Sequence, residues 1–163
     1  MPGEECIFCA MVAGKIQPAA KVYEDGEHLA FLDINPRNPG HTVVITKRHY
    51  EVILDVPEKE AGKLFELVRK LSISVKKGTQ ADGISILQNN YRASGQAVPH
   101  VHFHIIPRFN SEGPPALETI LSVKKMPEDV LKKIADSIKS GGGEQPKQEK
   151  PKETKKRDFL EDI

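Results

Sequence analysis

The sequence predicts an α+β domain built on a mostly antiparallel sheet, and three observations carry this prediction. Short segments rich in β-branched residues follow one another with turn signals such as Asp25-Gly26 between them. One long amphipathic segment interrupts the series. The chain has 163 residues, enough for one domain with a hydrophobic core of its own. Hairpin-linked strands with helices grouped between them are typical of the α+β class.

Each predicted element has a local signal in the sequence. A short helix is expected from Cys6 to Ala13, ending at Gly14. A polar loop over residues 90–99 joins the last two strands. His28, at the start of a strand after a turn, is expected at the surface. The five predicted strands, recognised by their β-branched and alternating apolar residues, cover residues 21–24, 28–33, 41–46, 83–89 and 101–107.

Two longer helices complete the prediction. The first opens at Pro57 and stops near Lys77-Gly78, and the last begins at Pro127. Residues at helical spacing are expected to face inward in the first, namely Ala61, Leu64, Phe65, Val68, Leu71 and Val75. The same spacing predicts an inward face in the last, formed by Val130, Leu131, Ile134 and Ile138.

The last part of the chain differs in composition from the rest. Residues 141–163 begin with three glycines and continue with alternating Gln, Lys, Glu and Pro, which leaves little apolar surface to bury. We therefore expect a folded domain over residues 1–140 and a flexible, low-complexity charged tail over residues 141–163. Phe159, Leu160 and Ile163 leave two alternatives open for the tail, a frayed end or a docking segment.

Charge and hydropathy exclude several functional classes. The formal net charge is +1, which gives no bulk electrostatic reason to expect nucleic acid as a partner. No apolar run approaches the roughly 20 residues that a membrane span needs. The acidic start, MPGEEC, lacks the features of a secretory signal. A cytoplasmic protein without a membrane partner is expected.

Three of the six histidines fall within five residues, at positions 100, 102 and 104. Strand side chains alternate between faces, so these imidazoles share one face, and Val101, Phe103 and Ile105 share the other. The apolar set must face a core. A row of three imidazoles on the opposite face requires partners or a ligand.

Two chemistries compete for this row. Histidines separated by one residue chelate metals in some zinc enzymes. Alternatively, one neutral imidazole attacks phosphorus while its neighbours orient it or bind an anion. The preceding loop contains Gly95, whose backbone allows close approach, and Gln96, whose amide can hold an oxyanion or a water. This loop favours phosphoryl chemistry, although spacing alone leaves both alternatives open.

Cys6 and Cys9 have the spacing of half a zinc site. A pair of reduced thiols under a short helix is the alternative. A redox role is weaker, because no thioredoxin-like βαβ pattern follows the two cysteines.

The segment from Gly95 to Arg108, GQAVPHVHFHIIPR, resembles the signature of the histidine triad family. The resemblance continues upstream in Cys6–Cys9, in residues 30–36 (AFLDINP) and in residues 39–49 (PGHTVVITKRH). It extends in collinear order over about residues 5 to 110, and therefore implies the histidine triad fold with a five-stranded sheet.

The resemblance implies a nucleotide hydrolase or transferase acting at an α-phosphate. His102 would attack, His104 would lie beside the phosphate, and His41 would orient the nucleophile. Gln96 and Asn89 match positions that contact the phosphate, and Asp33 matches the residue that binds the ribose hydroxyls. Apolar walls around the base would be formed by Ile7, Phe8, Met11 and Ile34. The triad ends in His104 rather than Gln, as in the hydrolase branches.

The resemblance also implies a metal site and an assembly. His49 and His100 match the positions that complete a Cys2His2 zinc site with Cys6 and Cys9 in zinc-bearing members. Four protein ligands would make this zinc structural. A homodimer is implied, and no organic cofactor is expected.

One departure bears on the substrate. Ala97 occupies a position where phosphoramidase-type members often have a Ser that protonates a leaving amine. The sequence therefore favours a hydrolase that releases a nucleoside 5′-monophosphate from dinucleoside polyphosphates, whose leaving group needs less protonation. The alternatives are a nucleoside phosphoramidate or adenylyl-amine hydrolase, a non-catalytic nucleotide-binding adaptor, and a metal hydrolase using all three row histidines.

Overall fold

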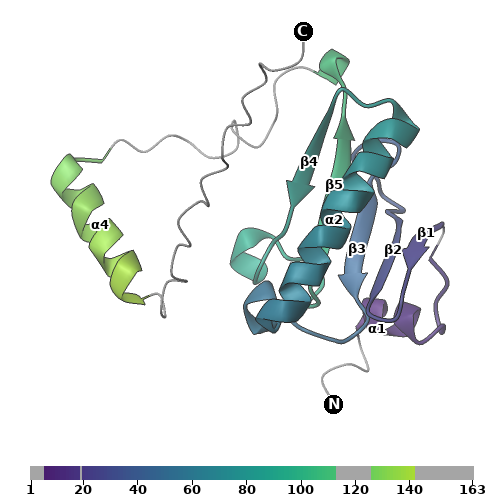
Figure 1. Cartoon of the computed structure of the whole chain (residues 1–163), viewed down its shortest axis with the longest axis horizontal. Helices are drawn as coiled ribbons and strands as arrows, with labels where there is room; N and C mark the ends of the chain where they lie inside the picture. Colours follow the sequence, from purple (N-terminus) through teal and green to yellow (C-terminus); the bar gives the residue numbers. More distant parts are fainter. Residues whose placement is uncertain (1–5, 19, 113–125, 142–163) are drawn as a thin grey trace, which may run out of the picture. The chain divides into compact units, whose positions relative to one another are not determined.

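The computed structural model of the chain describes residues 6–18, 20–112 and 126–141 (Figure 1). The chain divides into two compact units, residues 1–115 and 116–163, and each is described by itself. The expected charged tail lies outside the described residues except for Gly141, so the boundary at residue 140 stays a prediction.

The first unit is built on one five-stranded antiparallel sheet, which confirms the predicted α+β class. The spatial order is β1-β2-β3-β5-β4, so the strand that carries the histidine row lies between β3 and β4 (Figure 1). Each strand agrees with its predicted range to within two residues. The strands are β1 (Lys21–Glu24), β2 (His28–Leu32), β3 (Thr42–Thr46), β4 (Gly83–Leu87) and β5 (His102–Arg108).

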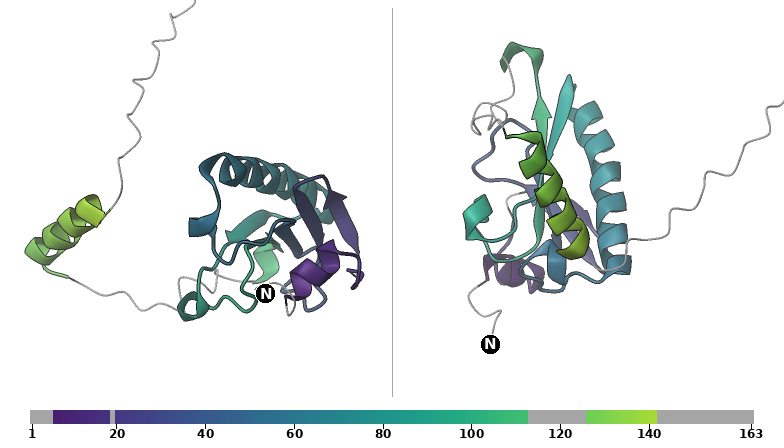
Figure 2. Two further views of the ribbon diagram at one scale, coloured as in Figure 1. Left: turned by 90° about the horizontal axis from the view of Figure 1, so that it is seen from below. Right: turned by 90° about the vertical axis from the view of Figure 1, so that its left-hand side faces the viewer.

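Helix α2 (Glu58–Thr79) covers one face of the sheet (Figures 1 and 2). Acidic residues in its first turn and Lys76 and Lys77 in its last complement the helix dipole. The helix ends at Thr79, one residue past the predicted stop near Lys77-Gly78, and Gln80 in the left-handed conformation closes its last turn. Its buried side chains pack on Ala30, Val44, Val101, Phe103 and Ile105, and they are Leu64, Leu67, Val68, Leu71 and Val75.

Phe65 corrects the predicted face of this helix. It is 53% exposed, and Leu67 is buried instead. Positions 64, 67, 68, 71 and 75 form one stripe at helical spacing, and Phe65 lies at the edge of that stripe. Its ring still packs edge-on against Phe103, with the ring centroids 5.0 Å apart.

Helix α1 (Ile7–Val12) packs on the other face of the sheet. Phe8 forms a second core with Leu29 and Phe31 of β2 and with Val43 and Ile45 of β3. These strand residues alternate with Ala30 and Val44, which face α2, so the two helices lie on opposite faces. Short 3-10 helices occupy three connections, η1 (Ile53–Asp55), η2 (Arg92–Ser94) and η3 (Asn110–Glu112).

In the second unit the structure describes one helix, α4 (Glu128–Gly141). Within this unit Leu131, Ile134 and Ile138 are exposed, and the prediction that they face inward stays a prediction. Ion pairs one turn apart, such as Glu128 with Lys132, support the helix from its polar side. No helix in the described part of the chain is long and apolar enough to cross a membrane.

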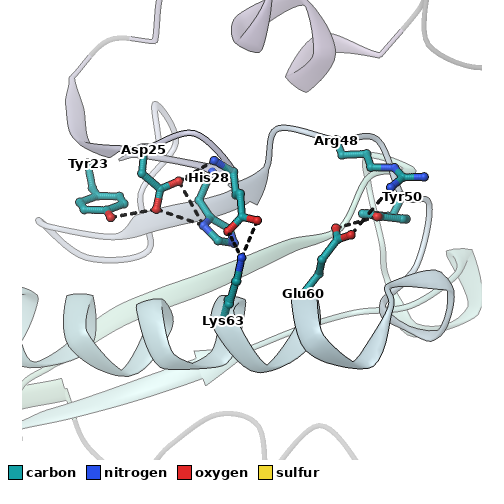
Figure 3. A network of polar contacts seen from close by, with 8 residues as sticks. Tyr23, Asp25, His28, Arg48, Tyr50, Glu60 and Lys63 are labelled. Carbon is teal, nitrogen blue, oxygen red and sulfur yellow. Dashed lines mark hydrogen bonds and ion pairs between the residues drawn. The ribbon is translucent and has the colours of Figure 1, made fainter.

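His28 is buried against the first turns of α2, which corrects its predicted surface position (Figure 3). Its Nδ1 lies 3.3 Å from Oδ2 of Asp25. Asp25 also accepts hydrogen bonds from the backbone N–H groups of Glu27 and His28 and from the hydroxyl of Tyr23. Partial burial opposes ionisation of Asp25, but these donors outweigh it and lower the pKa of Asp25 to about 2.

Polar contacts also tie α2 to the strands (Figure 3). Lys63 donates to both carboxylate oxygens of Glu27 at 2.7 and 2.8 Å. Glu60 accepts a hydrogen bond from the hydroxyl of Tyr50 at 2.7 Å. These contacts fix the hairpin and the segment after β3 relative to the helix, and this segment carries His49.

We predict that Leu64→Ala lowers the free energy of unfolding by about 2–5 kcal/mol, because a fully buried side chain leaves a cavity under α2. Urea unfolding measures the change. Leu54→Ala is the matched control, since Leu54 is 73% exposed and its loss is expected to cost less than about 0.5 kcal/mol. Equal losses in the two variants would contradict the described core.

The pKa of Asp25 predicts a loss of stability in acid. A carboxyl whose pKa is lowered on folding stabilises the protein above its unfolded pKa, near 4, and loses that contribution as the pH falls toward 2. Between pH 5 and pH 3 the loss due to Asp25 is about 1 kcal/mol after allowance for its partial exposure. Asp25→Asn is expected to remove this part of the acid sensitivity, whereas Asp55→Asn, on an exposed carboxyl, leaves it. Unfolding curves at pH 5 and pH 3 measure the free energy of unfolding of each protein. If Asp25→Asn and Asp55→Asn both lost as much stability between these pH values as the wild-type protein does, the prediction would be wrong.

Candidate functional site

The histidine row, with His100 just before β5 and His102 and His104 within it, follows the predicted alternation. Val101, Phe103 and Ile105 are buried in the core beneath α2. His100 and His102 are buried on the opposite face, where the ring of Phe8 lies against both at centroid distances of 5.7 and 5.4 Å. A strand fixed by its apolar side therefore presents its imidazoles to the α1 side of the sheet.

The proton on His100 is placed by a backbone carbonyl. Its Nε2 lies 2.8 Å from the carbonyl oxygen of Thr46, which can only accept a hydrogen bond. Nε2 therefore carries the proton, and Nδ1 keeps its lone pair. Nδ1 lies 3.4 Å from Sγ of Cys6 and 3.6 Å from Sγ of Cys9.

His102 has the opposite arrangement. Its Nδ1 lies 2.7 Å from the carbonyl oxygen of His100, so Nδ1 is the protonated nitrogen. Nε2 keeps its lone pair, and the buried ring fixes the direction in which this lone pair points. Successive histidines of the row thus present different nitrogens to their surroundings.

His104 is oriented by His41. Nδ1 of His41 accepts a hydrogen bond from the backbone N–H of Arg37 at 3.2 Å, which places the proton of His41 on Nε2. That nitrogen donates to Nδ1 of His104 at 2.9 Å, so His104 carries its proton on Nε2. Asp33 lies 3.7 Å from Nδ1 of His41. His41 was expected to orient His102, but in the structure it contacts His104, and the carbonyl of His100 orients His102.

Burial lowers the pKa of four imidazoles, those of His41, His100, His102 and His104. It lowers the pKa of His100 and of His104 to about 4, and neighbouring imidazoles add to the effect in both cases. The pKa values of His102 and His41 are also lowered by burial, which their hydrogen bond or ion-pair partners oppose. The imidazoles are therefore neutral at pH 7, the form in which a ring nitrogen attacks phosphorus or binds a metal.

Cys6, Cys9, His49 and His100 come together as a group able to hold a metal ion, with all four ligand atoms within 4.8 Å of one another. Sγ of Cys9 lies 3.3 Å from Nδ1 of His49, and the Nδ1 atoms of His49 and His100 are 3.2 Å apart. Within the described ranges the three row histidines do not form one metal-binding group. His100 joins the cysteines, and His104 joins Asp33 and His41.

The loop after β4 holds Gln96 through both ends of its amide. Oε1 accepts the backbone N–H of Tyr91 at 2.7 Å, and Nε2 donates to the carbonyl of Glu51 at 2.7 Å. Asn89 lies under the same loop, with its amide nitrogen 3.9 Å from the position a side chain on Gly95 would take. Gln96 therefore shapes the loop in this conformation.

The residues expected around a nucleoside lie in α1 and directly after β2. Phe8 and Met11 pack on the second core, and Ile7 and Ile34 are exposed. Asp33 follows β2, and its Oδ1 accepts the backbone N–H of Asn35 at 2.8 Å. Because Asp33 lies beside His41, which contacts His104, the Asp33 carboxylate is at the His104 end of the row.

The sequence did not indicate the groups that place the protons. They are the carbonyls of Thr46 and His100 and the N–H of Arg37, all of them backbone atoms. No residue type identifies such partners. The strand pairing alone provides a signal, because Ile45 lies opposite His102 and so brings Thr46 near His100.

The comparisons with known proteins agree with this geometry. The HIT domain profile matches residues 15–111, more than half of the chain. An uncharacterized HIT-like protein of Methanocaldococcus jannaschii, MJ0866, is 51% identical over 108 residues, covering 66% of this chain and 82% of the relative. The adenosine 5′-monophosphoramidase hnt1 of Schizosaccharomyces pombe is 42% identical over 107 residues, covering 66% of this chain and 77% of that protein.

A solved structure shares the fold. The crystal structure of SMU.412c from Streptococcus mutans has a TM-score of 0.76 and 40% sequence identity, and covers 86% of this chain and 88% of its own. The chain therefore belongs to the HIT, or histidine triad, family, as its histidine row and sheet predict.

Proposed function

We propose that this protein is a nucleotide hydrolase that cleaves at an α-phosphate and releases a nucleoside 5′-monophosphate. The observation that carries the proposal is the hydrogen bond from Nδ1 of His102 to the carbonyl of His100, which leaves Nε2 as a directed lone pair. A neutral, buried imidazole with one free nitrogen is a nucleophile at neutral pH.

In the first step Nε2 of His102 forms a bond to the α-phosphorus. The bond from phosphorus to the leaving oxygen breaks, and the leaving group takes its electron pair. The ring then carries positive charge, which strengthens the bond from its Nδ1–H to the His100 carbonyl. Water next forms a bond to phosphorus while the phosphorus–nitrogen bond breaks and its electron pair returns to Nε2 of His102. The proton that the water loses passes to solvent, and the nucleoside 5′-monophosphate leaves.

His104 supports both steps by donating its Nε2–H to a phosphate oxygen. His41 holds this tautomer through its 2.9 Å hydrogen bond. Asn89 and Gln96 border the same phosphate position, Gln96 through the loop that it shapes. The ribose hydroxyls bind Asp33, and the base lies against Ile7, Phe8, Met11 and Ile34, the apolar side chains on the α1 side.

The leaving group that the site favours is a phosphate chain. Ala97 follows Gln96 and offers no hydroxyl to protonate a departing amine. A polyphosphate leaving group needs less protonation than an amine does, so dinucleoside polyphosphates are the proposed substrates. Phosphoramidates are the alternative, supported by the name of the Schizosaccharomyces pombe relative. Homodimer formation and a cytoplasmic location stay predictions.

We also propose that Cys6, Cys9, His49 and His100 bind one structural zinc ion. Tetrahedral zinc with sulfur at about 2.3 Å and nitrogen at about 2.0–2.1 Å requires ligand atoms about 3.3–3.8 Å apart. The distances from Nδ1 of His100 to the other three ligand atoms are 3.4, 3.6 and 3.2 Å. The carbonyl of Thr46 holds His100 in the tautomer that a metal needs. The zinc would connect α1 to the strand that carries the nucleophile.

His102→Ala is expected to lower kcat/KM for diadenosine tetraphosphate by about 10⁴-fold or more, because the nucleophile is lost. Product analysis of AMP release measures the change. His28→Asn is the control, since His28 is buried on the α2 side and is expected to keep activity within about threefold. Thermal unfolding of both variants verifies that they are folded. Unchanged turnover in His102→Ala would overturn the assignment of the nucleophile.

Metal analysis of the protein purified without chelator is expected to give about one zinc per chain, and Cys9→Ser to reduce it strongly. Burial and the neighbouring Cys6 raise the pKa of the Cys9 thiol to about 11 in the metal-free site, so zinc binding releases a proton. The apparent Kd for zinc therefore falls as the pH rises from 6 to 8, by about tenfold per pH unit for each proton released. Absence of metal from the wild-type protein, or a Kd independent of pH, would rule out the proposed site.

A further inference from the structure

Tyr91 has a backbone conformation that side chains rarely adopt. Its φ is 65° and its ψ is 161°, in a region populated almost entirely by glycine. Among the described residues, Gln80 is the other non-glycine residue with positive φ, but at ψ 31° it lies in the ordinary left-handed region at the end of α2. Tyr91 therefore carries local strain that Gln80 does not.

The surrounding loop holds Tyr91 in this conformation. Its N–H donates to Oε1 of Gln96 at 2.7 Å. Its carbonyl accepts the N–H groups of Ser94 at 3.1 Å and of Gln96 at 3.3 Å. The amide of Gln96 in turn donates to the carbonyl of Glu51. These bonds involve only the backbone of Tyr91, so a glycine at this position would satisfy them without strain.

The ring of Tyr91 does not contribute to the interior. It is 51% exposed, and neither hydrophobic core includes it. Strained residues of this kind concentrate at functional sites, where the side chain gives a benefit that folding does not. The position in the sheet indicates which benefit this is.

The sheet order and register place this loop beside the strand that carries the proposed nucleophile. Leu87 of β4 pairs with His104, and continuing this antiparallel register by two residues brings Asn89 level with His102. Tyr91 follows two residues later. The sheet order places β5 between β3 and β4, so the β2 and β3 residues on which α1 packs, and Asp33 after β2, lie on one side of the histidine row, and the loop after β4 lies on the other.

We propose that Tyr91 is a specificity-determining residue that stacks on a flat heteroaromatic ring in the leaving group. The inference rests on the proposed hydrolase function and identifies its substrate class as nucleotides with a second base, such as dinucleoside polyphosphates. With the first nucleoside on the α1 side, in-line displacement sends the leaving group away from His102 and past the β4 loop. A half-exposed tyrosine offers an aromatic face to a base there.

Two substrates with the same phosphate chain test this role. Diadenosine tetraphosphate has a second base, and adenosine 5′-tetraphosphate does not; both release AMP. The measured quantity is the ratio of their kcat/KM values. Tyr91→Ala and Tyr91→Gly are expected to lower the ratio by about fivefold to 100-fold, the usual effect of losing one base–aromatic stack. Tyr91→Phe keeps the ring and is expected to hold the ratio within about twofold.

Phe65→Ala is the matched control. Phe65 is 53% exposed, close to the exposure of Tyr91, but it lies on α2 across the sheet from the histidine row. Its loss is expected to leave the ratio unchanged. Tyr91→Gly is also expected to raise the unfolding temperature by a few degrees, because glycine adopts this conformation without strain. A lower unfolding temperature would make Tyr91 a packing residue and overturn the inference.

Equilibrium binding separates this inference from the proposed function. In a His102→Ala background, Tyr91→Gly is expected to weaken binding of diadenosine tetraphosphate but not of AMP, which has no leaving group. If the wild-type protein hydrolyses no nucleotide but this selective loss is observed, the proposed function fails and the role of Tyr91 in binding a second base stands. If hydrolysis depends on His102 but neither the ratio nor the binding changes, the role of Tyr91 fails alone.

Discussion

The site depends on two hydrogen bonds from imidazoles to backbone carbonyls. His100 donates from Nε2 to Thr46, and His102 donates from Nδ1 to His100. Because a carbonyl can only accept, each bond fixes which nitrogen keeps its lone pair. Nδ1 of His100 is thereby directed to Cys6 and Cys9, and Nε2 of His102 is free for chemistry. One segment of chain can thus serve the proposed metal site through His100 and the proposed reaction centre through His102, two residues later.

The bond from His100 to Thr46 joins two strands and requires the sheet to be held in register. The carbonyl of Thr46 belongs to β3, and its distance from His100 follows from the pairing of Ile45 with His102. Helix α2 packs on Val101 and Phe103 from the other side. Core packing and proton placement are therefore consequences of the same alternation along β5. Loss of packing in the core under α2 would therefore disturb the histidines, although no residue of that core is proposed to touch a substrate.

The sequence predicted those parts of the molecule that periodicity and residue type encode. Alternation in β5 predicted the row, and the Cys6 and Cys9 spacing with two matching histidines predicted the metal group. It could not predict backbone acceptors, because every residue has a carbonyl; the partner of His41 was therefore assigned to His102 instead of His104. Phe65 was placed inward because helical spacing alone does not separate the centre of an apolar stripe from its edge.

Burial completes the arrangement by keeping the imidazoles neutral, which makes the position of the single proton on each ring decisive. The central claim is that His102 carries its proton on Nδ1 and presents a bare Nε2. Nitrogen-15 NMR of the full chain at neutral pH measures this tautomer directly through the couplings of each ring nitrogen to the ring protons. The account predicts a protonated Nδ1 and an unprotonated Nε2 for His102. A proton on Nε2, or on both nitrogens, would contradict it.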